Sequence, residues 1–337
     1  MRPAVLWLQI FGAGFALIVA LLVLTLATPT PYGDLSRLGR LSDQQFGWLA
    51  PPPRVDSALL QGVALNQADI LVLGDSFSMS HRWQSTLVAH GYRVATGFWG
   101  LFGDVLCDDF DQWLADAGFQ GKLVIIQSVE RLLPSRLEDS AKCRTMRRPL
   151  RAKEAPFLEP LETLPPATFN WTAPLLSGWI TWRNTEAALA SPGDTLAEPN
   201  TRARVVPNGC ELFSNRLCRK ALFFSEDDVL GEIAPRAVEH MRDFSRAHPA
   251  VPILWMIIPN KTTVYLEPSH SKGFAEAFAR SGLGPDLFSF TMSERNQVKD
   301  FYFPNDTHLS MHGQLKLGAR MLAAVEARLP PPRTTRP

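Results

Sequence analysis

The longest run of apolar residues in the chain lies at its N-terminus. Residues Ala4 to Ala27 contain one strongly polar side chain, that of Gln9. As a helix this stretch is about 36 Å long, enough to cross a hydrocarbon core of ~30 Å. Arg2 precedes it and no basic residue follows before Arg37, which predicts a cytoplasmic N-terminus. We therefore expect residues 1–28 to form a transmembrane anchor.

A cleaved signal peptide is the alternative, because Thr25 to Ala27 have the small residues of a cleavage site. The apolar region of a signal peptide usually spans only ~7–15 residues, so the length of the run favours an uncleaved anchor. Both alternatives export the rest of the chain. The anchor predicts a single-pass protein of the inner (cytoplasmic) membrane whose main part faces the periplasm.

From Asp69 onward, short apolar runs alternate with segments of helical pattern. Four runs have the length and flanks of buried strands, with the sequences ADILVLGD, YRVAT, LVIIQSV and VPILWMIIP. Helices are expected at about 80–90, 105–117, 228–247, 272–280 and 310–327. This alternation predicts an α/β fold with a mostly parallel sheet that helices cover on both faces.

The remaining segments break this alternation. A Pro/Gly-rich stretch at 29–65 is expected to be a tether that holds the folded part off the membrane. The main domain is expected at 66–329, and its regularity is interrupted by a Pro- and Trp-containing insertion at about 149–225. The insertion is either functional or a cover for the domain edge. Residues 330–337 are expected to be a disordered tail.

Composition narrows the class of protein. Hydrophobic residues make up 46% of the chain and charged residues 20%, and the formal net charge is +1. The first two values are typical of a globular protein. The charge balance excludes the broad basic surface that binds nucleic acid.

The four cysteines fit an oxidising compartment. Cys210 and Cys218 enclose a short loop, and Cys107 and Cys143 remain as a second possible pair. Four cysteines permit three connectivities, among which the sequence does not choose. Free buried thiols are the alternative for Cys107 and Cys143. None of the four has the spacing of a metal ligand, and no metal site is expected.

The strand ILVLG runs directly into Asp75 and Ser76. Ligands of open α/β sheets bind outside the carboxyl ends of the strands, which is where Ser76 falls. A serine in this turn can act as a nucleophile, and its own backbone N–H can face a developing oxyanion. The alternative is an ordinary turn followed by a helix N-cap.

The other end of the chain supplies a base. Asp306 and His308 lie in the loop FYFPNDTHLSMHG, just before the last expected helix, whose N-cap is expected to be Ser310. A neutral imidazole can take a serine proton when a carboxylate holds its other ring nitrogen. A surface loop with an incidental histidine is the alternative.

Together these motifs resemble the SGNH (GDSL-type) hydrolase superfamily, and within it the alginate O-acetylation proteins. The resemblance spans most of Asp69 to Leu329, with the insertion as its weak part. It depends on four motifs, namely Gly74-Asp75-Ser76-Phe77, the segment from Pro259 to Tyr265 (PNKTTVY), Asp306-Thr307-His308 with Gly313, and IQSVERL at 126–132.

The resemblance implies a fold, a mechanism and partners. The fold would be an SGNH-like three-layer sandwich. Ser76 would be the nucleophile, His308 the base and Asp306 its orienting acid, without a metal or organic cofactor. The protein would be a membrane-anchored O-acetyltransferase acting on an exopolysaccharide or other envelope glycan. A membrane-bound O-acyltransferase would deliver the acetyl groups.

Two departures from the pattern affect the site. The order of the motifs matches the wider superfamily but differs from that of the alginate proteins. The Asp-x-His spacing matches the alginate proteins but differs from that of the wider superfamily. The usual Gly-x-Asn-Asp block is absent, which leaves one oxyanion donor unassigned. The backbone N–H groups of Ser76 and Gly100 are the candidates.

Four further residues are candidates for substrate binding. Glu130 and Arg131 follow a central strand, and Lys261 and Tyr265 follow the strand near 251–259. Arg131 would bind a carboxylate or a sugar, or else pair with an acid such as Glu130. For Lys261 the alternative is a structural salt bridge, and for Tyr265 it is packing.

Two other functions stay open at this stage. One is a plain acetylesterase or deacetylase of the same glycans, in which water takes the acetyl group. The other is a catalytically silent scaffold of a polysaccharide synthesis complex, which the missing Gly-x-Asn-Asp block favours and the Ser, Asp and His residues oppose. The sequence identifies neither the glycan, nor its hydroxyl, nor the acyl donor, nor the oligomeric state.

Overall fold

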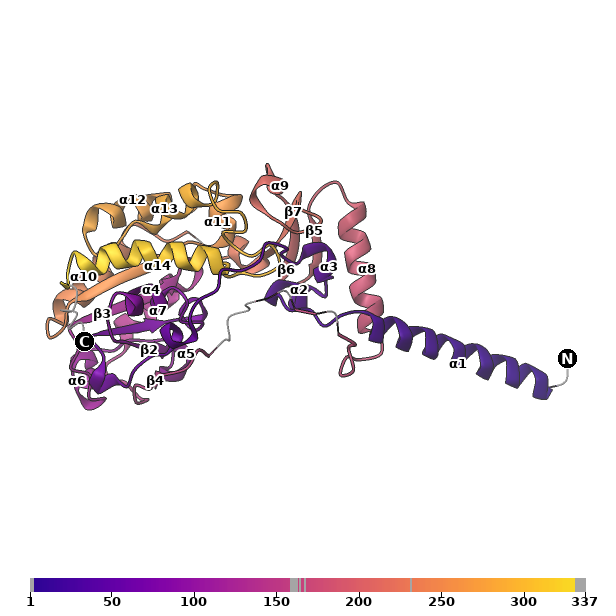
Figure 1. Ribbon diagram of the computed structural model, residues 1–337, viewed down its shortest axis with the longest axis horizontal. Coiled ribbons are helices and arrows are strands. Elements are labelled where there is room, and N and C mark those ends of the chain that lie inside the picture. The colour runs from indigo at the N-terminus through magenta and orange to yellow at the C-terminus, as the bar shows by residue number, and fades with distance from the viewer. Residues whose placement is uncertain (1–2, 158–162, 164, 167, 231, 331–337) are drawn as a thin grey trace. The chain divides into compact units, whose positions relative to one another are not determined.

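The computed structural model describes residues 3–157, 163, 165–166, 168–230 and 232–330 (Figure 1). Contacts divide the chain into two compact units. Unit 1 comprises Met1–Ala50, Leu164–Glu226 and Phe303–Thr307. Unit 2 comprises Pro51–Thr163, Asp227–Tyr302 and His308–Pro337.

Unit 2 is built on a five-stranded sheet in the order β4-β2-β1-β3-β8. Its strands are β1 (Ile70–Gly74), β2 (Val94–Phe98), β3 (Leu123–Val129), β4 (Ala152–Lys153) and β8 (Ile253–Ile258). Neighbours among β2, β1, β3 and β8 pair in parallel, and β4 pairs antiparallel with β2. The prediction of an α/β fold with a mostly parallel sheet is confirmed.

Both faces of this sheet are covered. All residues of β1, β3 and β8 are buried, which explains why these strands are continuous apolar runs rather than alternating ones. Leu71, Leu73, Val124 and Trp255 on one face pack into a core with α5, α6, α7, α10 and α12. On the opposite face lie α4 and α14, which pack against each other.

The helices of unit 2 follow the strands, as the crossover pattern requires. Their bounds are α4 (Gln84–Ala89), α5 (Trp99–Phe102), α6 (Phe110–Asp116), α7 (Leu133–Lys142), α10 (Ala237–Ala247), α11 (Lys261–Tyr265), α12 (Lys272–Ser281), α13 (Leu287–Glu294) and α14 (Met311–Glu326). The N-cap of α14 is Ser310, whose Oγ accepts a hydrogen bond from the Gly313 N–H, as predicted.

Three expected helices begin later than the sequence suggested, and one of them is α4, which starts at Gln84 rather than near residue 80. α10 starts at Ala237 rather than near residue 228, because a 3-10 turn occupies Ser225–Asp228 and Pro235 precedes the helix. Proline is tolerated at the first turn of a helix but not in its interior. α6 starts at Phe110 rather than at residue 105.

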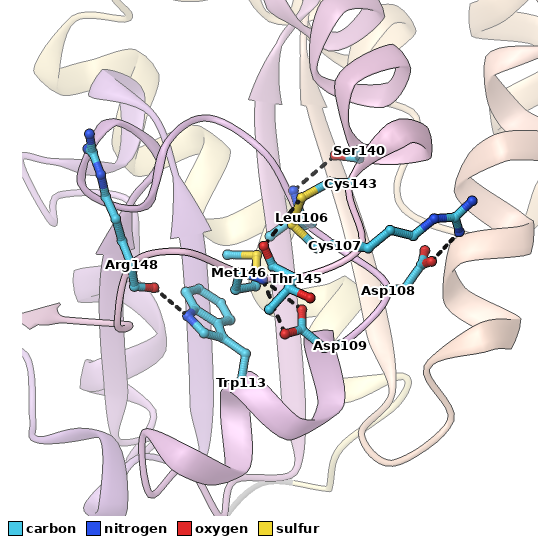
Figure 2. Close-up of a disulfide and its surroundings, with 11 residues drawn as sticks. Leu106, Cys107, Asp108, Asp109, Trp113, Ser140, Cys143, Thr145, Met146 and Arg148 are labelled. Atoms are coloured by element: carbon cyan, nitrogen blue, oxygen red, sulfur yellow. Dashed lines mark hydrogen bonds and ion pairs between the residues drawn. A yellow bond between two sulfur atoms is a disulfide. The ribbon is translucent and has the colours of Figure 1, made fainter.

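A disulfide joins the segment before α6 to the end of α7 (Figure 2). It links Cys107 to Cys143, across 36 residues of the chain. Beside it, the Leu106 N–H donates a hydrogen bond of 3.0 Å to Oγ of Ser140. Two segments that pack on one face of the sheet are therefore tied together covalently.

Unit 1 combines the N-terminal helices with the inserted segment. Its elements are α1 (Pro3–Ala27), α2 (Asp34–Gly39), α3 (Asp43–Phe46), α8 (Ser177–Ala190), β5 (Thr195–Glu198), β6 (Thr201–Val205), α9 (Gly209–Leu212) and β7 (Lys220–Phe224). The three strands form an antiparallel sheet in the order β5-β6-β7. A second disulfide, Cys210–Cys218, follows β6.

The expected tether at 29–65 is corrected by this unit. Leu35, Leu41 and Phe46 are fully buried and share a core with Ala203 and Leu222 of the inserted sheet. Residues 34–46 therefore fold onto a segment that follows them by more than 150 positions. The Pro and Gly residues that suggested a spacer mark turns between short helices instead.

The expected N-terminal helix is present as α1, and it is long and apolar enough to cross a membrane. By length and composition alone, a signal sequence passes the same test. Of the predicted tail at 330–337, only Pro330 belongs to the described residues.

Candidate active site

Ser76 and His308 meet in unit 2. Ser76 begins a 3-10 turn directly after β1, at the carboxyl end of the strand. His308 directly precedes Leu309, which pairs with Tyr302 in an isolated bridge, and lies two residues before Ser310, the N-cap of α14. Nε2 of His308 is 2.7 Å from Oγ of Ser76. The structure thus brings together the predicted nucleophile and its predicted base across 232 positions of sequence.

The geometry of this pair suits proton transfer. In the tautomer that carries its proton on Nδ1, the imidazole accepts a hydrogen bond from the Ser76 hydroxyl at Nε2. Both side chains are half-buried, so a substrate can still reach them. The ring of Phe77 packs on the imidazole, with ring centroids 4.7 Å apart. This contact restricts the orientation of His308.

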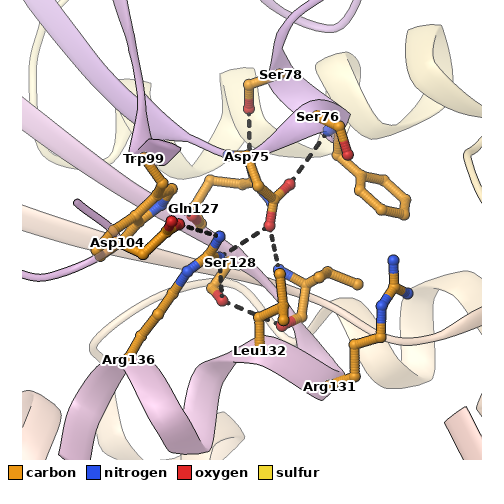
Figure 3. Close-up of polar contacts among 12 residues, drawn as sticks. Asp75, Ser76, Ser78, Trp99, Asp104, Gln127, Ser128, Arg131, Leu132 and Arg136 are labelled. Atoms are coloured by element: carbon orange, nitrogen blue, oxygen red, sulfur yellow. Dashed lines mark hydrogen bonds and ion pairs between the residues drawn. The ribbon is translucent and has the colours of Figure 1, made fainter. Parts of the chain in front are cut away.

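The residue before Ser76, Asp75, is the centre of a buried network (Figure 3). One carboxylate oxygen of Asp75 accepts hydrogen bonds from the Phe77 N–H (3.1 Å) and Nε2 of Gln127 (2.8 Å). The other accepts from the Val129 N–H (2.8 Å) and Nη1 of Arg136 (3.0 Å). Asp75 therefore ties the Ser76 turn to the end of β3 and to α7.

Asp75 is ionised in this environment. Burial raises the pKa of its carboxyl, but the Arg136 guanidinium, Gln127 and the Val129 N–H outweigh that effect and hold the pKa below its ordinary value. Both side chains of the ion pair are 5% exposed. Arg136 also lies over the Trp99 ring, 4.5 Å from its centroid. Sequence reasoning missed Arg136, since nothing in the pattern of α7 distinguishes it from a surface arginine.

Glycine is the one residue type that fits at position 74, the end of β1. A Cβ there would lie 2.5 Å from Oγ of Ser78 and 2.8 Å from Oε1 of Gln127. Oε1 of Gln127 accepts hydrogen bonds from the Asp75 N–H (2.9 Å) and from Ser78 (2.8 Å). Close packing thus explains the glycine of the Gly-Asp-Ser sequence, and electrostatics explains its aspartate.

Asp306, the predicted orienting acid, belongs to unit 1. Its Oδ2 accepts a hydrogen bond of 2.9 Å from the Asp34 N–H. Asp34 in turn accepts hydrogen bonds from the N–H (2.9 Å) and the hydroxyl (2.6 Å) of Thr307. The start of α2 therefore holds the Asp306–Thr307 segment, a role of Asp34 that the sequence did not indicate. The action of Asp306 on His308 stays a prediction.

Three of the four expected substrate-binding residues lie in the interior of unit 2. Glu130, Lys261 and Tyr265 are 1%, 2% and 5% exposed. Oε2 of Glu130 accepts hydrogen bonds from the Asn260 N–H (2.8 Å) and from Thr263 (2.7 Å). These contacts join the ends of β3 and β8, so in this structure the three side chains pack rather than present a surface to substrate.

Arg131 is the least buried of the four, with a side chain 12% exposed. Its Nη1 lies 3.4 Å from a carboxylate oxygen of Asp227 and 3.4 Å from Oδ1 of Asn260. Of the two roles expected for it, the structure shows an ion pair, with Asp227 rather than Glu130 as the acid. The burial of Glu130 raises the pKa of that carboxyl.

Gly100, the second candidate oxyanion donor, lies in α5 just after β2. Gly74 and Phe98 are partners in the parallel pairing of β1 and β2. Ser76 and Gly100 therefore each lie two residues beyond a paired position, at the same edge of the sheet. The carbonyl of Gly100 accepts a hydrogen bond from Arg148. The role of its N–H as an oxyanion donor stays a prediction.

A scan against models of known protein families, a search of curated proteins and a search of solved structures each gave no match.

Proposed function

We propose that the protein transfers an acyl group through a covalent intermediate on Ser76, and that this group is acetyl. The observation that carries this proposal is the 2.7 Å contact between Oγ of Ser76 and Nε2 of His308 at the carboxyl end of β1. A half-buried serine hydroxyl paired with an imidazole is the arrangement that activates a weak nucleophile.

In the first step, Oγ of Ser76 attacks the carbonyl carbon of an acetyl ester, and His308 takes the hydroxyl proton at Nε2. Collapse of the tetrahedral intermediate breaks the ester bond, and His308 returns the proton to the departing alcohol. The Ser76 N–H, and that of Gly100, would donate to the oxyanion. Asp306 would hold Nδ1 of the imidazole and stabilise its charged form.

In the second step, a hydroxyl group attacks the acetyl-Ser76 ester while His308 removes its proton. As the bond between the acetyl group and Oγ breaks, His308 gives this proton to Ser76 and the free serine is restored. A sugar hydroxyl as acceptor gives an acetylated glycan, and water gives acetate. We favour transfer to an exopolysaccharide or other envelope glycan, with the resemblance to alginate O-acetylation proteins as support. The acetylesterase uses the same first step and remains the second candidate.

The fold and location belong to the same proposal. The parallel sheet with the nucleophile after β1 and the histidine before the last helix supports an SGNH-like three-layer sandwich. α1 would cross the inner membrane, and the two disulfides fit a periplasmic location, because disulfides persist in oxidising compartments. A membrane-bound O-acyltransferase would supply the acetyl group. A silent scaffold would have no need of the Ser76–His308 contact.

The test uses full-length protein in detergent, because α1 packs against α8. Cleavage of an activated acetyl ester is measured with and without oligosaccharide acceptors, for wild type and for Ser76→Ala. Ser135→Ala, on the exposed side of α7, is the matched control. Ser76-dependent cleavage supports the acyl-enzyme, and acetylated acceptor supports transfer. Equal activity in wild type and Ser76→Ala would overturn the mechanism.

A further inference from the structure

Unit 1 carries an exposed aromatic patch beside the end of α1. The patch consists of apolar side chains on α8 and on the segment before it, each between 36% and 76% exposed, namely Phe169, Trp171, Leu175, Leu176, Trp179 and Trp182. The rings of Trp179 and Trp182 are paired, with centroids 5.0 Å apart. Contiguous apolar surface of this kind marks an interaction site in a folded protein.

The tryptophans of the chain divide sharply by exposure. Of nine in the sequence, five are at most 6% exposed. The other four lie on α1 or in the aromatic patch, namely Trp7, Trp171, Trp179 and Trp182. On α8, Gly178, Thr181 and Ala188 are buried while the two indoles face outward. The exposed indoles thus occupy two places, one near each end of α1.

The patch is fixed at the level of the last turn of α1. Oγ1 of Thr25 donates a hydrogen bond of 2.5 Å to the Leu175 carbonyl, and the Asn170 N–H donates to the Leu26 carbonyl at 3.2 Å. A Cβ on Gly178 would lie 2.6 Å from Cα of Thr25, so the two backbones touch there. α8 runs across the end of α1 rather than along it (Figure 1).

The length of α1 places this level at a membrane boundary. At 1.5 Å per residue, Trp7 and Thr25 are separated by about 27 Å along the helix axis. A hydrocarbon core is ~30 Å thick, so when α1 crosses a bilayer both residues lie close to its boundaries. Tryptophan is enriched at those boundaries, because its ring is apolar and its N–H is polar.

We propose that the aromatic patch lies in the headgroup region of the bilayer that α1 crosses and holds unit 1 on the membrane surface. Arg37 and Arg40, both exposed, line a groove of about 410 Å³ together with Pro174 and Leu176. Basic side chains at this level face lipid phosphates. The proposal rests on α1 crossing a bilayer and is independent of the chemistry proposed for Ser76.

The test measures tryptophan fluorescence in full-length protein reconstituted into vesicles of phosphatidylethanolamine and phosphatidylglycerol. The vesicles carry lipids brominated close to the headgroup. In the Trp7→Phe protein, the exposed indoles that remain are those of the patch. In the triple variant Trp171→Phe, Trp179→Phe, Trp182→Phe, the one that remains is Trp7 of α1. Phenylalanine keeps the patch apolar, and Trp48→Phe, at a buried position, is the control.

We expect the brominated lipid to quench the tryptophan fluorescence of both the Trp7→Phe protein and the triple variant. The fluorescence of Trp48→Phe should be quenched to the same extent as that of wild type. Aqueous iodide should quench the Trp7→Phe protein weakly. If the brominated lipid quenched the tryptophan fluorescence of the triple variant alone, the proposal would be overturned. The patch would then contact water or a protein partner rather than lipid. Absence of lipid quenching in both proteins would overturn its premise, that α1 is inserted.

Discussion

At the scale of single residues, two side chains far apart in sequence make the contact on which the proposed chemistry depends. Ser76 supplies the hydroxyl, and His308 approaches it through Nε2 while Phe77 packs on its ring. Asp75, next to the nucleophile, takes no part in proton transfer in this account. Its four hydrogen bonds position the turn that presents Ser76.

Replacing the base should remove activity without unfolding the protein. We expect His308→Ala to lower kcat/KM for an activated acetyl ester by about 10²–10⁴-fold, the contribution usual for a general base. His312→Ala is the matched control, because His312 is half-buried like His308 but bonds to the Pro51 carbonyl instead. Steady-state kinetics with thermal unfolding of both variants checks this. A comparable loss in His312→Ala would contradict the assignment.

Neutralising Asp75 should instead cost stability. Asp75→Asn leaves the buried Arg136 guanidinium with the exposed carboxylate of Asp104, 3.4 Å from its Nη2, as counter-charge. Loss of the buried partner of such a pair typically costs about 3–5 kcal/mol of unfolding free energy. Arg136→Met in the same protein should recover part of that loss, since no buried charge then remains. Denaturant unfolding of the two single variants and the double variant checks this. Strictly additive losses would show that the two side chains are not coupled.

The ion pair should also appear in the pH dependence of stability. The folded-state pKa of Asp75 is lowered from its ordinary value of 3.8. The stabilisation from the pair is therefore fully present above that value and is lost as the pH falls through the folded-state pKa. Wild type should lose this increment in acid, and Asp75→Asn should have none to lose.

At the scale of elements, Glu130 joins the ends of β3 and β8. Its Oε2 accepts from the Asn260 N–H and from Thr263, and a glutamine oxygen can accept the same two bonds. The carboxylate is buried at 1% exposure. The link between the strands is thus made by hydrogen bonds. Burial makes the charge on Glu130 a net cost, although Nε2 of His270 lies 3.8 Å from its Oε1.

Glu130→Gln should therefore stabilise the protein near neutral pH. Burial raises the folded-state pKa of Glu130 above its ordinary value of 4.5. For an acid with a raised pKa, the stabilisation is present below the ordinary value and is lost as the pH rises through the folded one. The midpoint of thermal unfolding of Glu130→Gln should exceed that of wild type at pH 7–8, and the difference should vanish below about pH 4.5.

The exposed Glu239→Gln is the control for this comparison, and it should show no such pH dependence. An equal difference between Glu130→Gln and wild type at every pH would contradict the burial argument.

The elements also divide by how well the sequence predicts them. β1, β3 and β8 are buried on both faces, so each is a continuous apolar run that predicts a strand. For β3, the predicted bounds of residues 123–129 are the observed ones. The strands of unit 1 were missed. β6 carries Arg202 and Arg204 and is only partly buried, so it has neither a continuous apolar run nor a clean alternation.

At the scale of the whole chain, each unit contains one disulfide. Cys107–Cys143 of unit 2 spans 36 residues and Cys210–Cys218 of unit 1 spans 8. The loss of chain entropy in the unfolded state grows with the length of the loop that is closed. The longer loop should therefore contribute more to stability than the shorter one.

We expect Cys107→Ser with Cys143→Ser to lower the unfolding free energy by about 4 kcal/mol, and Cys210→Ser with Cys218→Ser by about 2–3 kcal/mol. Denaturant unfolding under oxidising conditions checks the order. A larger loss from the shorter loop would contradict the chain-entropy account for this protein.

The division into units is the part of the architecture that sequence patterns could not supply. Leu35 and Leu41 share a core with Ala203 and Leu222, and no local periodicity encodes a contact across so many residues. The site shows the same limit. Ser76 and His308 were predicted because each stands in a recognisable motif, whereas Gln127 and Arg136 act through a fold that brings β1, β3 and α7 together.

The most direct test of the central claim is covalent capture of the nucleophile. Full-length protein is treated with a fluorophosphonate or an activated acetyl ester, and the modified peptide is identified by mass spectrometry, with Ser76→Ala and His308→Ala alongside. We predict a single adduct on Ser76, absent from Ser76→Ala and formed far more slowly in His308→Ala. An adduct on another serine, or none on Ser76 in protein shown to be folded, would contradict the account.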